Sequence, residues 1–275
     1  MASEKDTWNM DPTLLEEAIV DRKKKTGKYP KAIIPVHLYG MPAKMKEIME
    51  TANRYEIPVL EDAAEALGSA LNGQKCGTFG HLAALSFNGN KMITTSGGGA
   101  LICNTEEEAK QCMFYATQAR DNAPHYQHSK IGYNYRLSNI CAGIGRGQMM
   151  VLEHHLRRRR ENHAIYTELL KGFPGIAVLQ NPSQEYESNF WLTTILVDPK
   201  EAGQTREDIR IRLEENNIES RPLWKPMHLQ PVYKDAPFYG TNVSEELFEE
   251  GLCLPSGPLV TKEDIERIVA VVLNK

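Results

Sequence analysis

The chain has 275 residues, of which 41% are hydrophobic and 25% are charged, a composition typical of one large globular domain or two smaller ones. The formal net charge of −4 gives no sign of a nucleic-acid partner. Because the chain starts without an apolar leader and has no apolar run long enough to span a bilayer, we expect a cytoplasmic protein with no membrane partner.

The N-terminal half alternates short apolar runs with helical patterns. Residues 31–40 (KAIIPVHLYG) predict a buried strand centred on Ile33, Ile34 and Val36, and residues 43–56 predict a helix. Three further strands and a helix follow along the chain. The strands are 57–64 (IPVLEDAA), 81–87 (HLAALSF) and 99–104 (GALICN), and the helix begins near Thr105. This alternation predicts a mostly parallel sheet covered by helices.

The second half begins with a helical pattern over residues 138–171, which GFPGI ends. A strand (189–198), a helix (205–218) and a final helix (262–273) are expected beyond it. Thr261 caps the final helix and Asp264 completes a weak capping box. We therefore place a large domain at residues 1–150. We place the long linking helix and a smaller α/β domain at residues 151–275.

Two other sequence features have ordinary explanations. The five cysteines include no CxxC pair, which favours reduced thiols over a disulfide framework or a zinc site. Residues 157–160 are four arginines in a helical pattern interleaved with glutamates. A solvated helix face is the favoured interpretation of this run, and a phosphate-binding patch is the alternative.

Lys91 lies between a short apolar strand and three consecutive glycines, residues 97–99. Taken alone, the stretch predicts a β-hairpin with Asn88-Gly89 as a two-residue turn and Lys91 in solvent. The rest of the chain offers another interpretation, in which Lys91 has a chemical role.

Two predicted strands that precede Lys91 each end in a polar residue. Asp62 ends the strand IPVLED, and ligands of open parallel sheets bind beyond the carboxyl ends of strands. Asp62 could equally be the N-cap of a helix that begins at Ala63, and both interpretations stay open. Ser86 ends the next strand, where its hydroxyl could meet a phosphate.

A lysine, a strand-end aspartate and such a hydroxyl are the groups that pyridoxal phosphate (PLP) needs. Lys91 would form a Schiff base with the aldehyde of PLP. Asp62 would keep the pyridine nitrogen protonated, and Ser86 would hold the phosphate.

The segments VLEDAAEALGS, GTFGHLAALSFNGNKMITTSGGGALI and IGYNYRLSNICAGIGRGQMMVLE together resemble the DegT-type sugar-nucleotide aminotransferases. These are fold-type-I PLP enzymes, and the resemblance runs from about Asp6 to the C-terminus. It implies a PLP-transferase-like α/β fold, with Lys91 as the Schiff-base lysine, Asp62 as the partner of the ring nitrogen and Ser86 as a phosphate ligand.

The resemblance extends to residues around the substrate. Glu65 stands where many members have Gln or His near the ring hydroxyl, and this variant resembles the subgroup that aminates UDP-4-keto-6-deoxy-N-acetylglucosamine. The stretch RPLWKPMHLQPVYKDAPFYG resembles the substrate-side loop of that subgroup. It implies that Trp224 and His228 bind substrate, together with Arg136 of GYNYR. A loop histidine bonded to backbone is the alternative for His228.

The implied reaction moves an amino group from glutamate, which becomes 2-oxoglutarate, to a UDP-linked 4-keto-6-deoxy sugar in amino-sugar and surface-glycan biosynthesis. The resemblance also implies a homodimer in which Asn134 reaches the PLP phosphate of the neighbouring subunit.

Family chains carry a segment before the point that matches Asp6, so we expect an N-terminally incomplete fold. A catalytically impaired, regulatory or binding relative is therefore the alternative. Lys91 argues against the related PLP-dependent sugar dehydratases, which replace the lysine with histidine. The lack of GxGxxG after a strand argues against a dinucleotide-binding protein.

Overall fold

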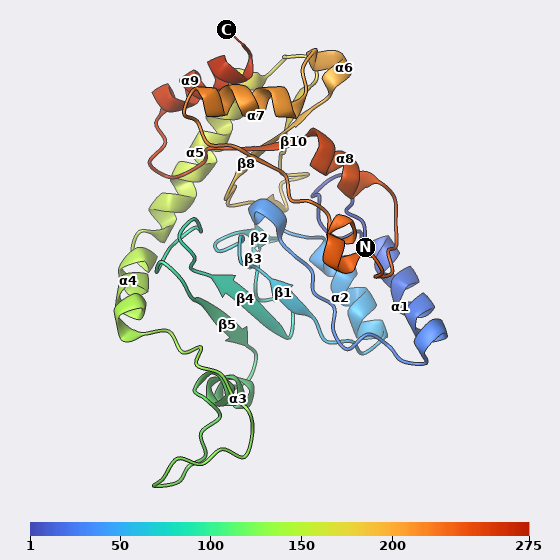
Figure 1. Ribbon diagram of the computed structural model, residues 1–275, viewed down its shortest axis with the longest axis vertical. Helices are drawn as coiled ribbons and strands as arrows, with labels where there is room; N and C mark the ends of the chain where they lie inside the picture. Colours follow the sequence, from blue (N-terminus) through green and yellow to red (C-terminus); the bar gives the residue numbers. More distant parts are fainter. Residues whose placement is uncertain (275) are drawn as a thin grey trace.

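The computed structural model describes residues 1–274. Its N-terminal half is built on a three-stranded sheet in the order β1-β4-β5 (Figure 1). β1 and β4 pair in parallel, with Asp62 opposite Ala84, and β5 pairs antiparallel with β4. The elements of this half are α1 (Pro12–Thr26), the 3-10 turn η1 (Leu38–Gly40), α2 (Met45–Arg54), β1 (Leu60–Asp62), β2 (Ala70–Leu71), β3 (Gln74–Lys75), β4 (Leu82–Ser86), β5 (Gly99–Cys103) and α3 (Glu106–Ala116).

The strand predicted over residues 31–40 is reduced to two isolated parallel bridges, from Ile33 to Val59 and from Val36 to Asp62. Pro35 lies between the bridges and has no N–H for a ladder hydrogen bond. Of the three apolar residues placed at the centre of this strand, only Ile33 is buried, while Ile34 is 53% exposed. The predicted strand therefore runs beside β1 as far as His37, but it is interrupted at Pro35 and is not buried throughout.

The hairpin interpretation of the Lys91 region is correct for the strands and wrong for the turn. β4 and β5 pair from Leu82 opposite Cys103 to Ser86 opposite Gly99. The loop 87–98 connects the two strands. The hydrogen bond from Phe87 N–H to Gly98 O joins the ends of this loop, so Asn88-Gly89 does not form a two-residue turn. Lys91 lies in this loop with its side chain only 13% exposed, so it is not a solvated residue.

The expected helices form where local signals predict them, with one break. Thr105 caps α3 in a capping box with Glu108, and Thr261 does the same for α9 with Asp264. The pattern over residues 138–171 divides at 150–151 into α4 (Asn139–Met149) and α5 (Leu152–Leu170). Glycines 143, 145 and 147 lower helix propensity on the N-terminal side of this break, so interrupting the helix there costs little.

The C-terminal half contains a second, antiparallel sheet in the order β6-β8-β10-β9. Helices α5, α7 and α9 pack over it around Tyr166, Ile195, Ile209 and Ile265 (Figure 1). The elements of this half are β6 (Ile176–Val178), β7 (Tyr186–Glu187), β8 (Thr193–Val197), α6 (Pro199–Ala202), α7 (Arg206–Glu215), β9 (Arg221–Pro222), η2 (Met227–Leu229), η3 (Pro231–Tyr233), α8 (Val243–Glu250), β10 (Gly251–Leu254) and α9 (Lys262–Val272).

The division into residues 1–150 and 151–275 stays a prediction. The break between α4 and α5 falls at this point, but β7 of the second half pairs with β2 of the first. Among the helices of residues 1–274, none is both long and apolar enough to cross a membrane.

The arginines at 157–160 divide between solvent and the protein interior. Arg157 is exposed and lies near Glu161, as a solvated helix face predicts. Arg159 is buried and donates to the carbonyls of Trp191 and Ser256. Arg160 donates to the carbonyl of Ser188. The solvated-face prediction is therefore correct for Arg157 and wrong for Arg159 and Arg160, whose guanidinium groups tie α5 to backbone carbonyls of the second half.

Candidate active site

The sheet register places Asp62 and Ser86 on one face. Asp62 pairs with Ala84, and Ser86 is two residues further along the same strand, so the three side chains point to the same side. No helix begins at Ala63, which makes the helix-cap interpretation of Asp62 wrong. Asp62 Oδ1 instead accepts a hydrogen bond from Ala64 N–H at 3.2 Å. Within residues 1–274, its other carboxylate oxygen accepts none.

The opposite face holds a buried acid that fixes the end of β1. Glu61 accepts a hydrogen bond from His37 Nε2 at 2.9 Å, and Ala43 N–H donates to the other ring nitrogen of His37. Burial raises the pKa of Glu61, but the hydrogen bonds outweigh it and the net pKa lies below the usual value. The remaining donors to Glu61 are the N–H groups of Gly77, Phe79 and Gly80. These bonds hold the residue that precedes Asp62.

Glu65 follows β1 in a tight turn and is 10% exposed. Its Oε2 accepts a hydrogen bond from Tyr39 N–H at 2.7 Å, and its Oε1 lies 3.4 Å from Lys91 Nζ. Burial raises the pKa of Glu65, although the charge of Lys91 and the Tyr39 N–H oppose the rise. The structure therefore brings the predicted residues Glu65 and Lys91 into one ion pair.

Lys91 also contacts an aromatic residue from the second half of the chain. Its Nζ lies 4.1 Å from the ring centroid of Trp191, which is within cation–π range. Trp191 and Tyr39, which the sequence interpretation missed, are both buried and lie next to Trp224. A tryptophan directly before an apolar strand, β8, is the local signal that could have singled out Trp191.

A cavity of about 860 Å³ opens between the carboxyl end of β1 and residues 223–238. Asp62, Glu65 and Tyr39 line it on the sheet side, and Trp224 and His228 line it on the loop side. His228 Nε2 lies 2.9 Å from Glu245 Oε1 and its ring packs on Phe238, so its partner is a side chain and not backbone. The cavity thus combines carboxylates, a histidine and aromatic rings.

The structure does not bring Asn134 and Arg136 to this cavity. Both are exposed and belong to the segment between α3 and α4, which projects from the body of the molecule (Figure 1). Within residues 1–274, backbone contacts alone hold them, through the bridge from Thr117 to Asn134 and the bond from Arg136 N–H to Ala116 O. Their predicted role from a neighbouring subunit stays a prediction.

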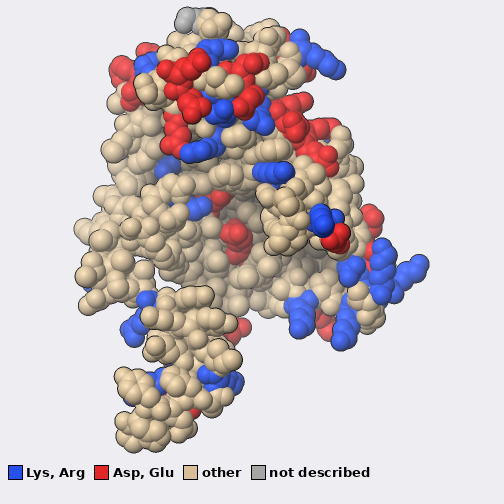
Figure 2. All heavy atoms as spheres, in the orientation of Figure 1, with Lys and Arg blue, Asp and Glu red and all other residues tan. Residues whose placement is uncertain are grey.

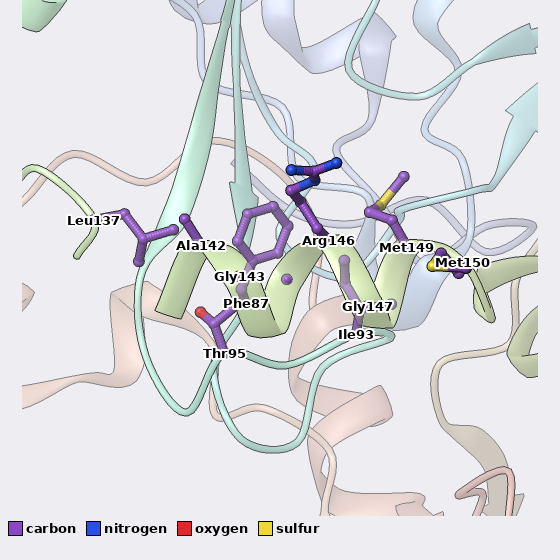
Figure 3. A pocket seen from close by; sticks show the side chains of 11 residues that line it. Phe87, Ile93, Thr95, Leu137, Ala142, Gly143, Arg146, Gly147, Met149 and Met150 are labelled. Atoms are coloured by element: carbon purple, nitrogen blue, oxygen red, sulfur yellow. The ribbon is translucent and has the colours of Figure 1, made fainter. Parts of the chain in front are cut away.

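A second cavity, of about 690 Å³, lies between α4 and the loop that carries Lys91. Figure 3 shows Phe87 and Ile93 of that loop against the helix and the Arg146 guanidinium pointing away from it. Its other side chains carry no charge. A cavity of this kind suits apolar contacts better than a charged substrate.

The side chains at and beside the first cavity fit PLP. Asp62 and Glu65 line the cavity, and Lys91 pairs with Glu65. A largely buried lysine amine with a carboxylate beside it, a strand-end aspartate with one carboxylate oxygen that accepts no hydrogen bond within residues 1–274, and a serine hydroxyl on the same sheet face form the donor set that this cofactor needs. Lys91 would hold its aldehyde carbon, Asp62 its ring nitrogen and Ser86 its phosphate.

Comparisons with known proteins identify a family of PLP-dependent aminotransferases. A sequence profile described as the DegT/DnrJ/EryC1/StrS aminotransferase family matches residues 2–273. EpsN of Bacillus subtilis (strain 168), described provisionally as a pyridoxal phosphate-dependent aminotransferase, is 48% identical over 276 residues, which cover 99% of this chain and 70% of EpsN. GDP-perosamine synthase of Escherichia coli O157:H7 is 34% identical, over 96% of this chain and 68% of the synthase.

The fold of a solved relative matches as well. The crystal structure of a DegT DnrJ EryC1 StrS aminotransferase from Brucella abortus has a TM-score of 0.90 and 30% identity, over 99% of this chain and 71% of that one. The predicted fold-type-I, PLP-transferase-like fold is thereby confirmed. The chain belongs to the DegT/DnrJ/EryC1/StrS aminotransferase family, which comprises sugar aminotransferases that use pyridoxal phosphate.

Proposed function

We propose that the chain transfers the amino group of glutamate to a UDP-linked 4-keto-6-deoxy sugar and releases 2-oxoglutarate. The observation that carries this proposal is the ion pair between Lys91 and Glu65, because Glu65 and Asp62 both line the 860 Å³ cavity. The cavity is large enough for a substrate of this class and has polar groups on both sides.

Each side chain has a task in this proposal. When bound, PLP supplies an electron sink that stabilises negative charge at the reacting carbon. Lys91 Nζ is the base that takes the proton from the α-carbon of the donor and later returns a proton on the substrate side. Asp62 keeps its negative charge toward the ring nitrogen. Proton transfer by a positioned side chain contributes roughly 10²–10⁴-fold to a rate.

Glu65 and the loop side of the cavity would orient the substrate. The Glu65 carboxylate, held by Tyr39 N–H and Lys91, would accept hydrogen bonds from the substrate. Trp224 offers a ring face for a sugar or base, and the His228 ring is held by Glu245 with one edge at the cavity. We propose these residues as substrate contacts.

Reduction with borohydride after incubation with PLP, followed by peptide mapping, tests the assignment of Lys91. We expect the label on Lys91, and a label on Lys23, Lys130 or any other lysine would contradict the proposal. Amino transfer from glutamate is then measured with a UDP-linked and a GDP-linked 4-keto-6-deoxy sugar. A rate with the GDP sugar alone would overturn the UDP assignment, since the perosamine synthase relative is named for a GDP sugar.

We further propose that the chain works as a homodimer that places Asn134 at the site of the neighbouring subunit. Apolar side chains are exposed along α4 and the segment before it, and Ile131 and Met150 are 87% and 88% exposed. Figure 2 shows few charged atoms on the flank formed by α4. A second copy of this chain would cover them. Light scattering that gives the mass of one chain would contradict this proposal.

A further inference from the structure

We propose that Trp191 is a positioning residue that fixes Lys91 toward Glu65. This inference rests on the proposed role of Lys91. The loop 87–98 that carries Lys91 is anchored on one side, because Met92 and Ile93 are buried against Leu152 and Leu156. Residues 88–90, on the other side of Lys91, are exposed. The lysine therefore lies where a buried stretch of the loop meets a solvated one.

The Trp191 indole hydrogen-bonds to the exposed residues 88–90. Its Nε1–H donates to Asn90 O at 2.7 Å, and among residues 1–274 no other element hydrogen-bonds to Asn90. The same ring lies under Lys91 Nζ, at 4.1 Å from its centroid. One side chain thus holds the backbone directly before Lys91 and also the ammonium group at the end of the Lys91 side chain.

Trp191 is itself held rigidly. It is 1% exposed, and its N–H donates to Asn189 Oδ1 at 2.8 Å. Between these residues Phe190 has a φ of +46°, a left-handed conformation that a non-glycine residue keeps only when its surroundings impose it. Ser188 Oγ accepts from Phe190 N–H and completes the constraint.

The same short segment positions the other member of the ion pair. Asn189 Nδ2 donates to Glu65 O at 2.8 Å and to Leu67 O at 3.0 Å. Gly40 has to be a glycine here, since a Cβ on it would lie 1.8 Å from Asn189 Oδ1. Residues 188–191 therefore contact Glu65 through Asn189 and Lys91 through Trp191. These contacts hold the Lys91 and Glu65 side chains next to each other.

Amide hydrogen exchange of the whole chain, read by mass spectrometry, tests this inference without relying on activity. Trp191→Leu removes both the indole N–H and the ring, and Trp191→Phe removes only the N–H. Within residues 88–91, the amides of Asn88 and Lys91 are hydrogen-bonded, to Ser86 Oγ and to Asn88 O. Release of Asn90 should loosen the loop, so we expect these two amides to exchange about fivefold faster or more in Trp191→Leu. Trp191→Phe should lie between Trp191→Leu and the unchanged chain.

Phe190→Leu is the matched control. It alters the neighbouring buried aromatic residue, which stacks on His163 and not on Lys91. Exchange of residues 88–91 should stay as in the unchanged chain. Equal exchange in Trp191→Leu and Phe190→Leu would overturn the inference, because Trp191 would then be an ordinary core residue.

Kinetics and labelling separate this inference from the proposed function. A positioning role predicts that Trp191→Leu lowers kcat about tenfold while KM for glutamate stays the same, with partial rescue in Trp191→Phe. If borohydride fails to label Lys91 in the unchanged chain, the proposed function is wrong, whatever exchange shows. If Lys91 is labelled but exchange of residues 88–91 does not respond to Trp191→Leu, the function stands and the positioning role is wrong.

Discussion

Two regions of the segment from β4 to α4 differ in how their side chains are surrounded. Side chains of the same chain surround Lys91, whereas apolar side chains near α4 are exposed. At the cavity, Lys91 has a carboxylate on one side and an indole on the other, both largely buried. Near α4, the chain exposes the side chains of Ile131, Ile140 and Met150. One chain thus surrounds Lys91 with its own side chains, whereas under the proposed dimer the Asn134 end would be completed by a second chain.

The largest effect should come from Lys91→Arg. Arginine keeps the positive charge beside Glu65 and over Trp191, so we expect the fold to survive, but a guanidinium does not release its proton and cannot act as a base. Turnover should fall by roughly 10²–10⁴-fold, measured as amino transfer from glutamate. Lys200→Arg, at an exposed position on α6, is the control and should leave the rate unchanged. Equal rates for the two variants would mean that Lys91 is structural.

Asp62→Asn should have the next largest effect on rate. Asn can accept the same hydrogen bond from Ala64 N–H, so folding should change little. The negative charge toward the ring nitrogen is lost, and removal of one electrostatic stabiliser typically costs roughly 10²–10³-fold in kcat. Thermal melting and amino-transfer rates measured on the same samples test both expectations. An unchanged rate with an unchanged melting temperature would show that Asp62 only holds the turn.

The sequence predicted the locally determined part of the fold. Helix starts at Thr105 and Thr261 were correct because a capping box involves residues only three apart. The strand over 31–40 was overestimated because its apolar residues line a cavity instead of packing, and sequence periodicity does not distinguish the two. The buried Arg159 was misinterpreted because its carbonyl partners, on Trp191 and Ser256, lie 32 and 97 residues away.

The residues of the candidate site also include some that a local sequence pattern predicts and some that it does not. Asp62, Ser86 and Lys91 could be found from the sequence because each follows a strand of one sheet, and the ends of neighbouring strands meet. Trp191 could not, since its partner Asn90 is 101 residues away and no local pattern links them. Asn134 and Arg136 were found by resemblance alone, and a single chain leaves them exposed.

Lowering the pH should lower the free energy of unfolding of the chain through the buried His163. Burial lowers the pKa of His163 to about 4, and its ring stacks on Phe190. Since the unfolded chain binds a proton at this histidine near pH 6.5 and the folded chain does not, stability falls as the pH drops from 6.5 toward 4. The loss from this group should reach about 2 kcal/mol at pH 5.

Urea unfolding of the unchanged chain and of His163→Gln between pH 7 and pH 5 measures this loss. Gln can still donate to Leu179 O, which His163 Nε2 contacts at 2.8 Å, but it does not titrate. The free-energy difference between the two proteins should therefore shrink by about 2 kcal/mol over this range. A constant difference would show that His163 titrates alike in the folded and unfolded chains.

The smallest effect on folding, and the sharpest test of the comparison, should come from Ile140→Lys on α4. Ile140 is 75% exposed, so the change should alter the free energy of unfolding of a single chain by less than about 0.5 kcal/mol. Its effect on association should be large, because a lysine buried at the centre of an apolar interface has no partner. Ile211→Lys is the matched control, since Ile211 is 43% exposed on α7, away from α4. Light scattering should give a single chain for Ile140→Lys and a dimer for Ile211→Lys. If both variants stay dimeric and equally active, the interface lies elsewhere, and the exposed side chains of α4 do not explain how Asn134 would reach a site.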